Sequence, residues 1–236
     1  MTFRYLAAAL GCLAGLVAMI SGTQFARADE TVDVGGSRAV LIKPNAPLGS
    51  VILMPGGDGS INAMPGGEIG SLFGNQLVRT RANYAAQGLA VLVVDAGVNL
   101  STAVDYMAAI KRPVTVVATS RGTQRAAQGI AAGAKPDALV LTSGFLSAGS
   151  GAGSSVMSIL GSPSLLPRTL VIHHREDNCR FTQPAGVDPF IKWSEGRARV
   201  AWLTGGPENG DPCQAAGHHG FAGIDGQVVA LAAAFH

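Results

Sequence analysis

Residues 114–122 read VTVVATSRG and lead directly into an alanine-rich stretch that ends before Gly133. The first part is apolar and β-branched without alternation, which is typical of a strand covered on both faces of a sheet. The second part has the composition of a helix, and the glycine is a common stop signal. The segment therefore predicts a buried strand that turns sharply into a helix at Ser120.

Strand-like and helix-like segments alternate on both sides of this turn. Further apolar strands are expected at residues 38–43, 50–54, 90–94, 138–142, 169–173 and 199–203. Helices are expected at residues 74–87, 102–110, 121–132 and 224–235. Residues 146–166 are rich in Ser and Gly and carry no clear element except a short helix-like run at 155–160. Such alternation indicates crossover units, a mostly parallel sheet and an α/β fold with helix, sheet and helix layers.

The predicted turn has small residues on both sides of its serine. Ala118 precedes Ser120 by two positions, and Gly122 follows it by two. In a tight strand-to-helix turn, larger side chains at these positions would collide with each other and with the neighbouring strand. The turn would expose the serine hydroxyl, and the N–H groups at the start of the helix would favour developing negative charge. A serine that only caps the helix has the same local sequence and remains the alternative.

A glycine-rich segment follows the predicted strand at residues 50–54. Residues 53–59 read LMPGGDG, and glycines allow backbone N–H groups to face a ligand closely. The segment is not a phosphate-binding loop of the Walker type, because no Gly-Lys-Ser or Gly-Lys-Thr follows. An ordinary glycine-rich turn remains the alternative.

Two later loops carry acidic and imidazole side chains. Residues 173–179 read HHREDNC after the predicted strand at 169–173, which places Asp177 in the crevice where open α/β sheets bind ligands. Glu176 competes with it as the acid. Residues 213–221 read CQAAGHHGF before the last predicted helix. His219 is favoured over His218 as a functional imidazole, because His219 directly precedes the Gly-Phe step.

These four segments resemble the serine hydrolases of the α/β-hydrolase superfamily, in particular compact dienelactone-hydrolase-like and esterase-like members. The serine turn resembles their nucleophile elbow, with Ala118 in place of the commoner glycine. The chain order Ser120, Asp177, His219 is the order expected of this superfamily. The resemblance extends from about residue 38 to the C-terminus, and it implies a three-layer fold with little or no cap domain.

The resemblance also implies a role for each residue. Ser120 would attack an acyl carbonyl, His219 would accept and return its proton, and Asp177 would hold the imidazole in one tautomer. The backbone N–H groups of Arg121 and of Gly57 or Asp58 would receive the oxyanion. The implied activity is that of an ester-cleaving, carboxylesterase-like serine hydrolase with no cofactor and no metal. Its substrate would be a small-molecule or extended acyl compound.

The N-terminal segment has the three-part form of a secretory signal peptide. A basic start, an apolar run at residues 5–20 and the small-residue site Ala26-Arg27-Ala28 follow one another. We therefore expect removal of residues 1–28, no membrane span afterwards, and a mature domain at residues 29–236 that is periplasmic or secreted. A single membrane anchor is the alternative, because the apolar run is just short of a span.

The mature chain would keep two cysteines, Cys179 and Cys213. In an oxidising compartment a disulfide between them is the natural expectation, and two unrelated free thiols are the alternative. Closing this loop would stabilise the fold by about 4 kcal/mol in the chain-entropy model. Such a bridge would tether the loop of Asp177 to the loop of His219.

Composition narrows the classes of function. The chain has 236 residues, 14% charged and 6% aromatic, with a formal net charge of +2. Without a basic block it has no electrostatic footprint for nucleic acid.

A binding protein that keeps the hydrolase fold without turnover is one competing hypothesis. A metal-dependent hydrolase is another, with ligands drawn from His173, His174, Asp177, His218 and His219.

Overall fold

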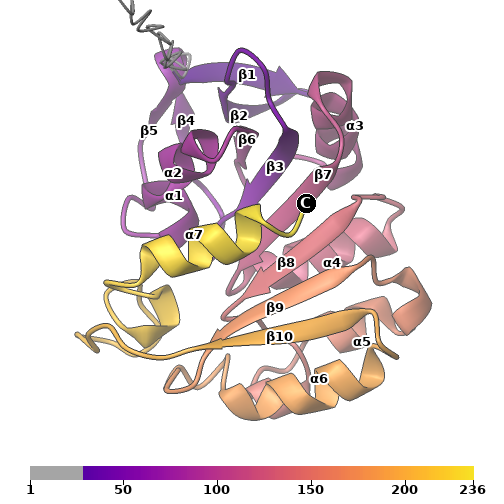
Figure 1. Cartoon of the computed structure of the whole chain (residues 1–236), viewed down its shortest axis with the longest axis vertical. Helices are drawn as coiled ribbons and strands as arrows, with labels where there is room; N and C mark the ends of the chain where they lie inside the picture. Colours follow the sequence, from indigo (N-terminus) through magenta and orange to yellow (C-terminus); the bar gives the residue numbers. More distant parts are fainter. Residues whose placement is uncertain (1–28) are drawn as a thin grey trace, which may run out of the picture.

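The computed structural model of the protein describes residues 29–236. One eight-stranded sheet runs through it in the order β1-β2-β6-β3-β7-β8-β9-β10, as Figure 1 shows. Its strands are β1 (Glu30–Val34), β2 (Ser37–Ile42), β3 (Gly49–Met54), β6 (Leu89–Val94), β7 (Val114–Thr119), β8 (Ala138–Thr142), β9 (Thr169–His174) and β10 (Ala198–Leu203). The ladders from β6 to β10 are parallel, whereas β2 pairs antiparallel with both β1 and β6. The predicted signal peptide at residues 1–28 lies outside the described residues.

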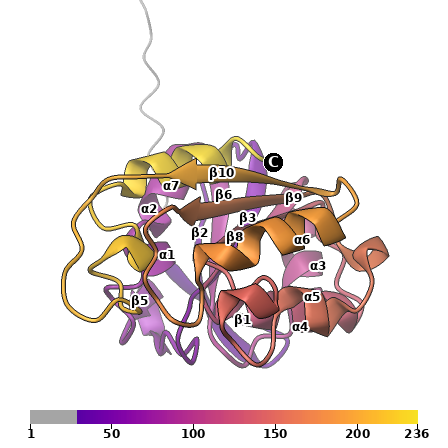
Figure 2. The same ribbon diagram turned by 90° about the horizontal axis from the view of Figure 1, so that it is seen from below.

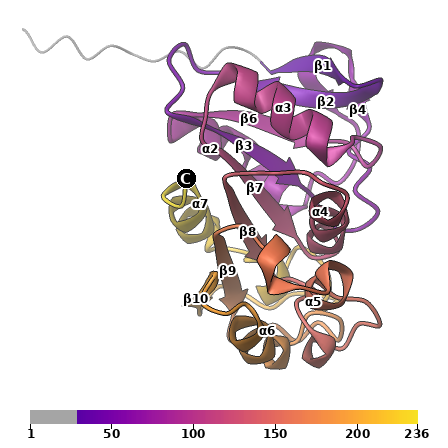
Figure 3. The same ribbon diagram turned by 90° about the vertical axis from the view of Figure 1, so that its right-hand side faces the viewer.

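Helices cover both faces of this sheet (Figure 2, Figure 3). One face carries α1 (Gln76–Arg79), α2 (Arg81–Ala86) and α7 (Asp225–Ala233). The other carries α3 (Leu100–Ile110), α4 (Gly122–Ala131), α5 (Val156–Leu160) and α6 (Val187–Trp193). A two-stranded ladder of β4 (Ala63–Met64) and β5 (Glu68–Ile69) lies outside the main sheet. The predicted three-layer α/β fold is confirmed.

The continuous apolar runs in the strands are explained by burial on both faces. In β3, Ile52 packs into the cluster under α3 to α6, and its neighbours Val51 and Leu53 pack into the cluster under α1, α2 and α7. Successive side chains of a strand point to opposite faces, so a strand covered on both faces is apolar at most of its positions. All residues of β3, β6, β7, β8 and β9 are buried.

Several elements differ from the sequence prediction. The expected helix at residues 74–87 is divided into α1 and α2 at Thr80, which caps the end of one and the start of the other. The sequence analysis did not predict the short strands β4 and β5, strand β1 or helix α6. Strand β1 is a partly exposed edge strand with charged residues, and α6 carries Pro189 in its first turn, where a missing N–H costs no helical hydrogen bond.

The parallel strands all point their carboxyl ends toward one edge of the sheet. Ser120 follows β7 there, residues 55–59 follow β3, and Asp177 lies beyond β9. At the opposite edge, the ring of His236 lies against Gly49 at the start of β3. Within residues 29–236, no helix is both long and apolar enough to span a bilayer.

Candidate active site

The turn at Ser120 has the strained backbone of a strand-to-helix elbow. Ser120 has φ +53°, in the left-handed region that non-glycine residues rarely adopt. A Cβ atom at Gly122 would lie 2.3 Å from the carbonyl oxygen of Met54 at the end of β3. Only glycine therefore fits there, because the start of α4 touches the neighbouring strand. The methyl group of Ala118 fits, fully buried in β7.

Ser120, His219 and Asp177 lie within hydrogen-bond distance of one another in series. His219 Nε2 is 3.1 Å from Ser120 Oγ, and His219 Nδ1 is 3.2 Å from Asp177 Oδ2. Both the imidazole and the carboxylate are buried. His219 lies in a single helical turn at His218–Gly220, and Ser143 Oγ donates a hydrogen bond of 2.7 Å to its carbonyl oxygen.

Thr182 is a fourth member of this arrangement that the sequence analysis missed. It is fully buried, and its Oγ1 lies 3.0 Å from Asp177 Oδ2 and 3.0 Å from His219 Nδ1. A carboxylate can only accept hydrogen bonds, so the hydroxyl of Thr182 donates its single proton to Asp177 Oδ2. His219 Nδ1 must then carry a proton shared between the two oxygens. This assignment leaves Nε2 with its lone pair toward Ser120, as a general base requires.

Replacing Thr182 with valine tests that assignment. Thr182→Val removes the hydroxyl at nearly constant volume and leaves Asp177 Oδ2 one donor short. We expect kcat for the ester hydrolysis that the sequence resemblance implies to fall about 10- to 100-fold, since a hydrogen bond to a charged group contributes about 1.5–3 kcal/mol. KM should hardly change, and Thr182→Ser should restore most of kcat. Equal losses in the valine and serine variants would contradict the role of the hydroxyl.

The loop after β9 folds around the carboxylate of Asp177. The N–H of Cys179 donates to Asp177 Oδ1 at 2.9 Å, while the competing Glu176 is exposed. Cys179 forms the expected disulfide with Cys213, at a Cα–Cα distance of 4.5 Å. The bond joins the loop of Asp177 to the loop that leads to His219.

The N–H groups near Ser120 are free to bind an oxyanion. The N–H of Ser120 itself donates to Thr142 O at 3.0 Å. Within residues 29–236, the N–H groups of Arg121, Gly57 and Asp58 donate to no protein atom. Gly57 and Arg121 line the cavity at Ser120, whereas Asp58 is exposed outside that lining.

A cavity of about 350 Å³ opens over Ser120. Its wall includes Leu72, Phe145, Phe181 and the disulfide Cys179–Cys213. The rings of Phe145 and Phe181 are nearly parallel, with centroids 6.3 Å apart. Polar side chains, among them Asn75, Gln214 and Arg121, share the wall with these apolar groups.

His173 lies behind the carboxylate and not in the cavity. Burial lowers its pKa to about 4, against an opposing effect of Asp177. Its Nε2 is 3.6 Å from Asp177 Oδ2, and neither ring nitrogen has a hydrogen-bond partner in the described part of the chain. His173 is therefore a neutral, buried neighbour of Asp177.

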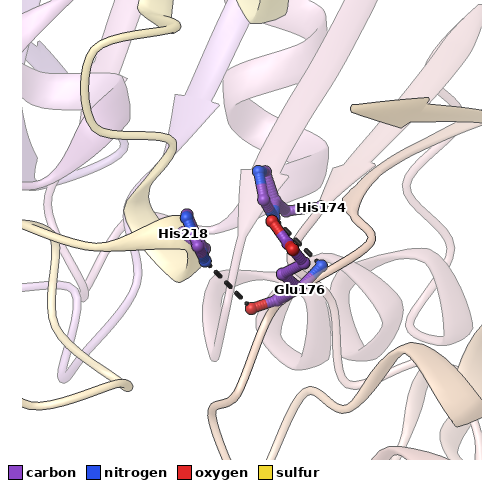
Figure 4. Close-up of side chains that lie close together, drawn as sticks. All are labelled: His174, Glu176 and His218. Atoms are coloured by element: carbon purple, nitrogen blue, oxygen red, sulfur yellow. Dashed lines mark hydrogen bonds between the residues drawn. The ribbon is translucent and has the colours of Figure 1, made fainter. Parts of the chain in front are cut away.

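Among residues 29–236, His174, Glu176 and His218 form the cluster that comes nearest to a metal site (Figure 4). The two imidazole rings are stacked, with centroids 4.2 Å apart and planes within 11° of parallel. An ion bound by an imidazole nitrogen lies in the plane of that ring, so stacked rings cannot share one ion. His174 Nδ1 also accepts the N–H of Glu176 at 3.1 Å, and His174 Nε2 faces Gly205 O at 2.9 Å. The cluster does not fit a metal.

Comparison with known proteins identifies the fold. No family model and no curated protein matches the sequence. A dienelactone hydrolase from Anabaena variabilis has a similar structure, with TM-score 0.59 and 15% identity over 89% of this chain and 95% of that one. For carboxyl esterase 2 from Tuber melanosporum, the TM-score is 0.56 and the sequence identity 15%, over 94% of this chain and 90% of that one. For an alpha-beta serine hydrolase homologue from Coxiella burnetii, the TM-score is 0.56 and the sequence identity 14%, over 87% of this chain and 95% of that one. The chain has the α/β-hydrolase fold.

Proposed function

We propose that the protein is an exported serine hydrolase that cleaves an ester bond through Ser120, His219 and Asp177. The observation that carries this proposal is the continuous series of hydrogen-bond distances from Ser120 Oγ through His219 to Asp177 Oδ2. A serine at an elbow with positive φ, next to unpartnered backbone N–H groups, gives further support. Esterases and hydrolases among the structural neighbours agree with it.

The reaction would proceed in two halves. Ser120 Oγ attacks the ester carbonyl while His219 Nε2 takes the hydroxyl proton, and the oxyanion forms against the N–H groups of Arg121 and Gly57. His219 then donates that proton to the departing alcohol, which leaves an acyl group on Ser120. A water molecule gives its proton to His219 and attacks the acyl carbon, and the acid is released as Ser120 recovers its proton.

Export is part of the same proposal. A disulfide is stable in an oxidising compartment and is rare in the cytosol, and the Cys179–Cys213 bond is present. Removal of the signal peptide at residues 1–28 would leave a single hydrolase domain at residues 29–236. N-terminal sequencing of the protein recovered from the periplasm or medium would test the expected cleavage between residues 28 and 29.

A fluorophosphonate probe tests the proposed chemistry directly. We expect one phosphonyl adduct on the wild-type protein, on the peptide that contains Ser120, and none after Ser120→Ala. A panel of p-nitrophenyl esters of increasing acyl length would then define the substrate. An unlabelled Ser120 in the folded protein would count against a serine hydrolase, and labelling without turnover of any ester would favour a binding protein.

The disulfide supports a further expectation about reduction. Cys179 holds Asp177 through its N–H, and both cysteines line the cavity. We expect ester hydrolysis to fall at reductant concentrations that leave far-UV dichroism unchanged, because the two loops separate before the sheet unfolds. A Cys179→Ser/Cys213→Ser double variant should show no response to reductant. Parallel loss of both signals in the wild type, or loss of neither, would be contrary to this expectation.

A further inference from the structure

Arg125 lies on α4, the helix that follows Ser120, and contacts the glycine loop, defined here as residues 55–59. Its Nη1 donates to Gly57 O at 3.0 Å, and its Nη2 donates to Pro55 O. A Cβ atom at Gly59 would lie 2.5 Å from Nη2. The guanidinium group is therefore packed directly against the backbone of the glycine loop.

In the glycine loop, the backbone carbonyl groups of residues 55–57 have hydrogen-bond partners, whereas the backbone N–H groups of residues 56–58 have none in the described part of the protein. The carbonyl of Gly56 accepts the N–H of Gly59 at 3.1 Å, so three successive carbonyls, those of residues 55, 56 and 57, all have partners. The N–H groups of the same three peptide units belong to residues 56, 57 and 58. Within the described chain, none of them donates to a protein atom. In a trans peptide, C=O and N–H point in opposite directions, so fixing the carbonyls also fixes where the N–H groups point.

The glycine loop also lies against Ser120. A Cβ atom at Gly56 would lie 2.9 Å from the Cβ of Ser120. Gly56 and Gly57 both line the cavity over that serine. Arg125 holds the peptide units that carry the N–H groups of Gly56 and Asp58, and the unit between them carries the N–H of Gly57. It therefore fixes the Gly57 N–H, which faces the cavity over Ser120, from both sides along the chain.

Arg125 is half-buried, and it also lines a second cavity away from Ser120. It forms no ion pair among residues 29–236, although withdrawing part of a charge from water without an opposite charge nearby is costly. Burial and the nearby Arg121 lower its pKa, and Asp58 opposes them. An arginine side chain remains charged in proteins. The guanidinium group donates instead to two backbone carbonyls of the glycine loop. This arrangement indicates that Arg125 holds that loop in place.

We propose that Arg125 is a positioning residue, which fixes the peptide planes of the glycine loop so that its N–H groups face the substrate carbonyl. The inference rests on the proposed function, in which the Gly57 N–H of this loop binds the oxyanion together with the N–H of Arg121. Arg125 does not touch the substrate. It links the helix of the nucleophile to the opposite half of the oxyanion hole, so that both halves move as one unit.

Arg125→Met tests the proposal by kinetics. We expect kcat for a p-nitrophenyl ester to fall about 10- to 100-fold, less than the 10²–10³ lost when an oxyanion donor is removed outright. KM should stay within about threefold, because the N–H groups act mainly on the transition state. Arg125→Lys should recover part of kcat, since an ammonium group can still donate to one carbonyl. The matched control is Arg199→Met, which removes an exposed charge at the amino end of β10.

A double variant separates positioning from general damage to the fold. Gly59→Ala pushes a methyl group into the guanidinium, and it also strains a backbone with φ +82° whether or not Arg125 is present. If both substitutions act on the same peptide planes, Gly59→Ala should lower kcat less in Arg125→Met than in the wild type, because the clash with the guanidinium is gone. A kcat equal to the product of the two separate losses overturns the proposal.

Hydrogen–deuterium exchange gives a readout that does not depend on activity. Peptides that cover the glycine loop should exchange faster in Arg125→Met than in the wild type or Arg199→Met, with the rest of α4 unchanged. Unchanged exchange together with kcat within twofold of the wild type overturns the proposal. If fluorophosphonate fails to label Ser120 in the wild type, the proposed function fails. Faster exchange confined to the glycine loop would then still establish that Arg125 positions it.

Discussion

Ser120→Ala should reduce ester hydrolysis about 10⁶-fold in kcat, the loss seen when the nucleophile of a triad is removed. Ser120 Oγ is the group that His219 Nε2 faces at 3.1 Å, and alanine offers no atom to form the acyl-enzyme. The fold should be retained, because the hydroxyl is not needed for any strand or helix contact. Active-site titration with a p-nitrophenyl ester, followed by steady-state kinetics, measures the loss. A residual kcat within 100-fold of the wild type would place the nucleophile elsewhere.

Ser120→Gly is the informative companion variant. It should be as inactive as Ser120→Ala but should unfold at a higher temperature. Alanine keeps the steric penalty of φ +53°, whereas glycine adopts positive φ without it. If both variants unfold at the same temperature, the turn stores no backbone strain.

Asp177→Asn should lower kcat about 10⁴-fold, with KM little changed. Both carboxylate oxygens of Asp177 accept from donors: Cys179 N–H on Oδ1, and Thr182 Oγ1 with His219 Nδ1 on Oδ2. An amide has only one acceptor oxygen, so one of these groups must face an NH₂. If the NH₂ faces His219, the imidazole adopts the tautomer that cannot take the proton of Ser120.

Glu176→Gln is the matched control for that variant. Glu176 is adjacent in the chain and exposed, and its contacts with His174 and His218 come from its backbone. The kcat of Glu176→Gln should stay within about twofold of the wild-type value. Comparable losses at positions 176 and 177 would mean that the acid is not Asp177 alone.

The sequence predicted the central strands well because burial on both faces demands an uninterrupted apolar run. Residues 138–142 were expected as a strand and form β8 with the same bounds. Edge strand β1 has charged and half-exposed residues, so its pattern does not differ from that of a polar loop. The short helix α6 was hidden by Pro189, which usually marks the end of a helix and here falls in its first turn.

The sequence predicted those site residues whose local pattern is unusual for an ordinary loop. A serine between small residues and a histidine before Gly-Phe both stand out, and the structure brings Ser120 and His219 together. Thr182 and Arg125 left no such signal. A threonine is common in loops and an arginine is common on helices. Their roles come from contacts across the fold that only the folded chain reveals.

The position of His236 has a practical consequence. The ring of this last residue lies at the beginning of β3, and the cavity opens at the end of the same strand. A polypeptide fused after His236, or a solid support attached there, would be on the reverse side of the molecule. Immobilisation through that end would leave the mouth above Ser120 accessible to bulky or surface-bound esters.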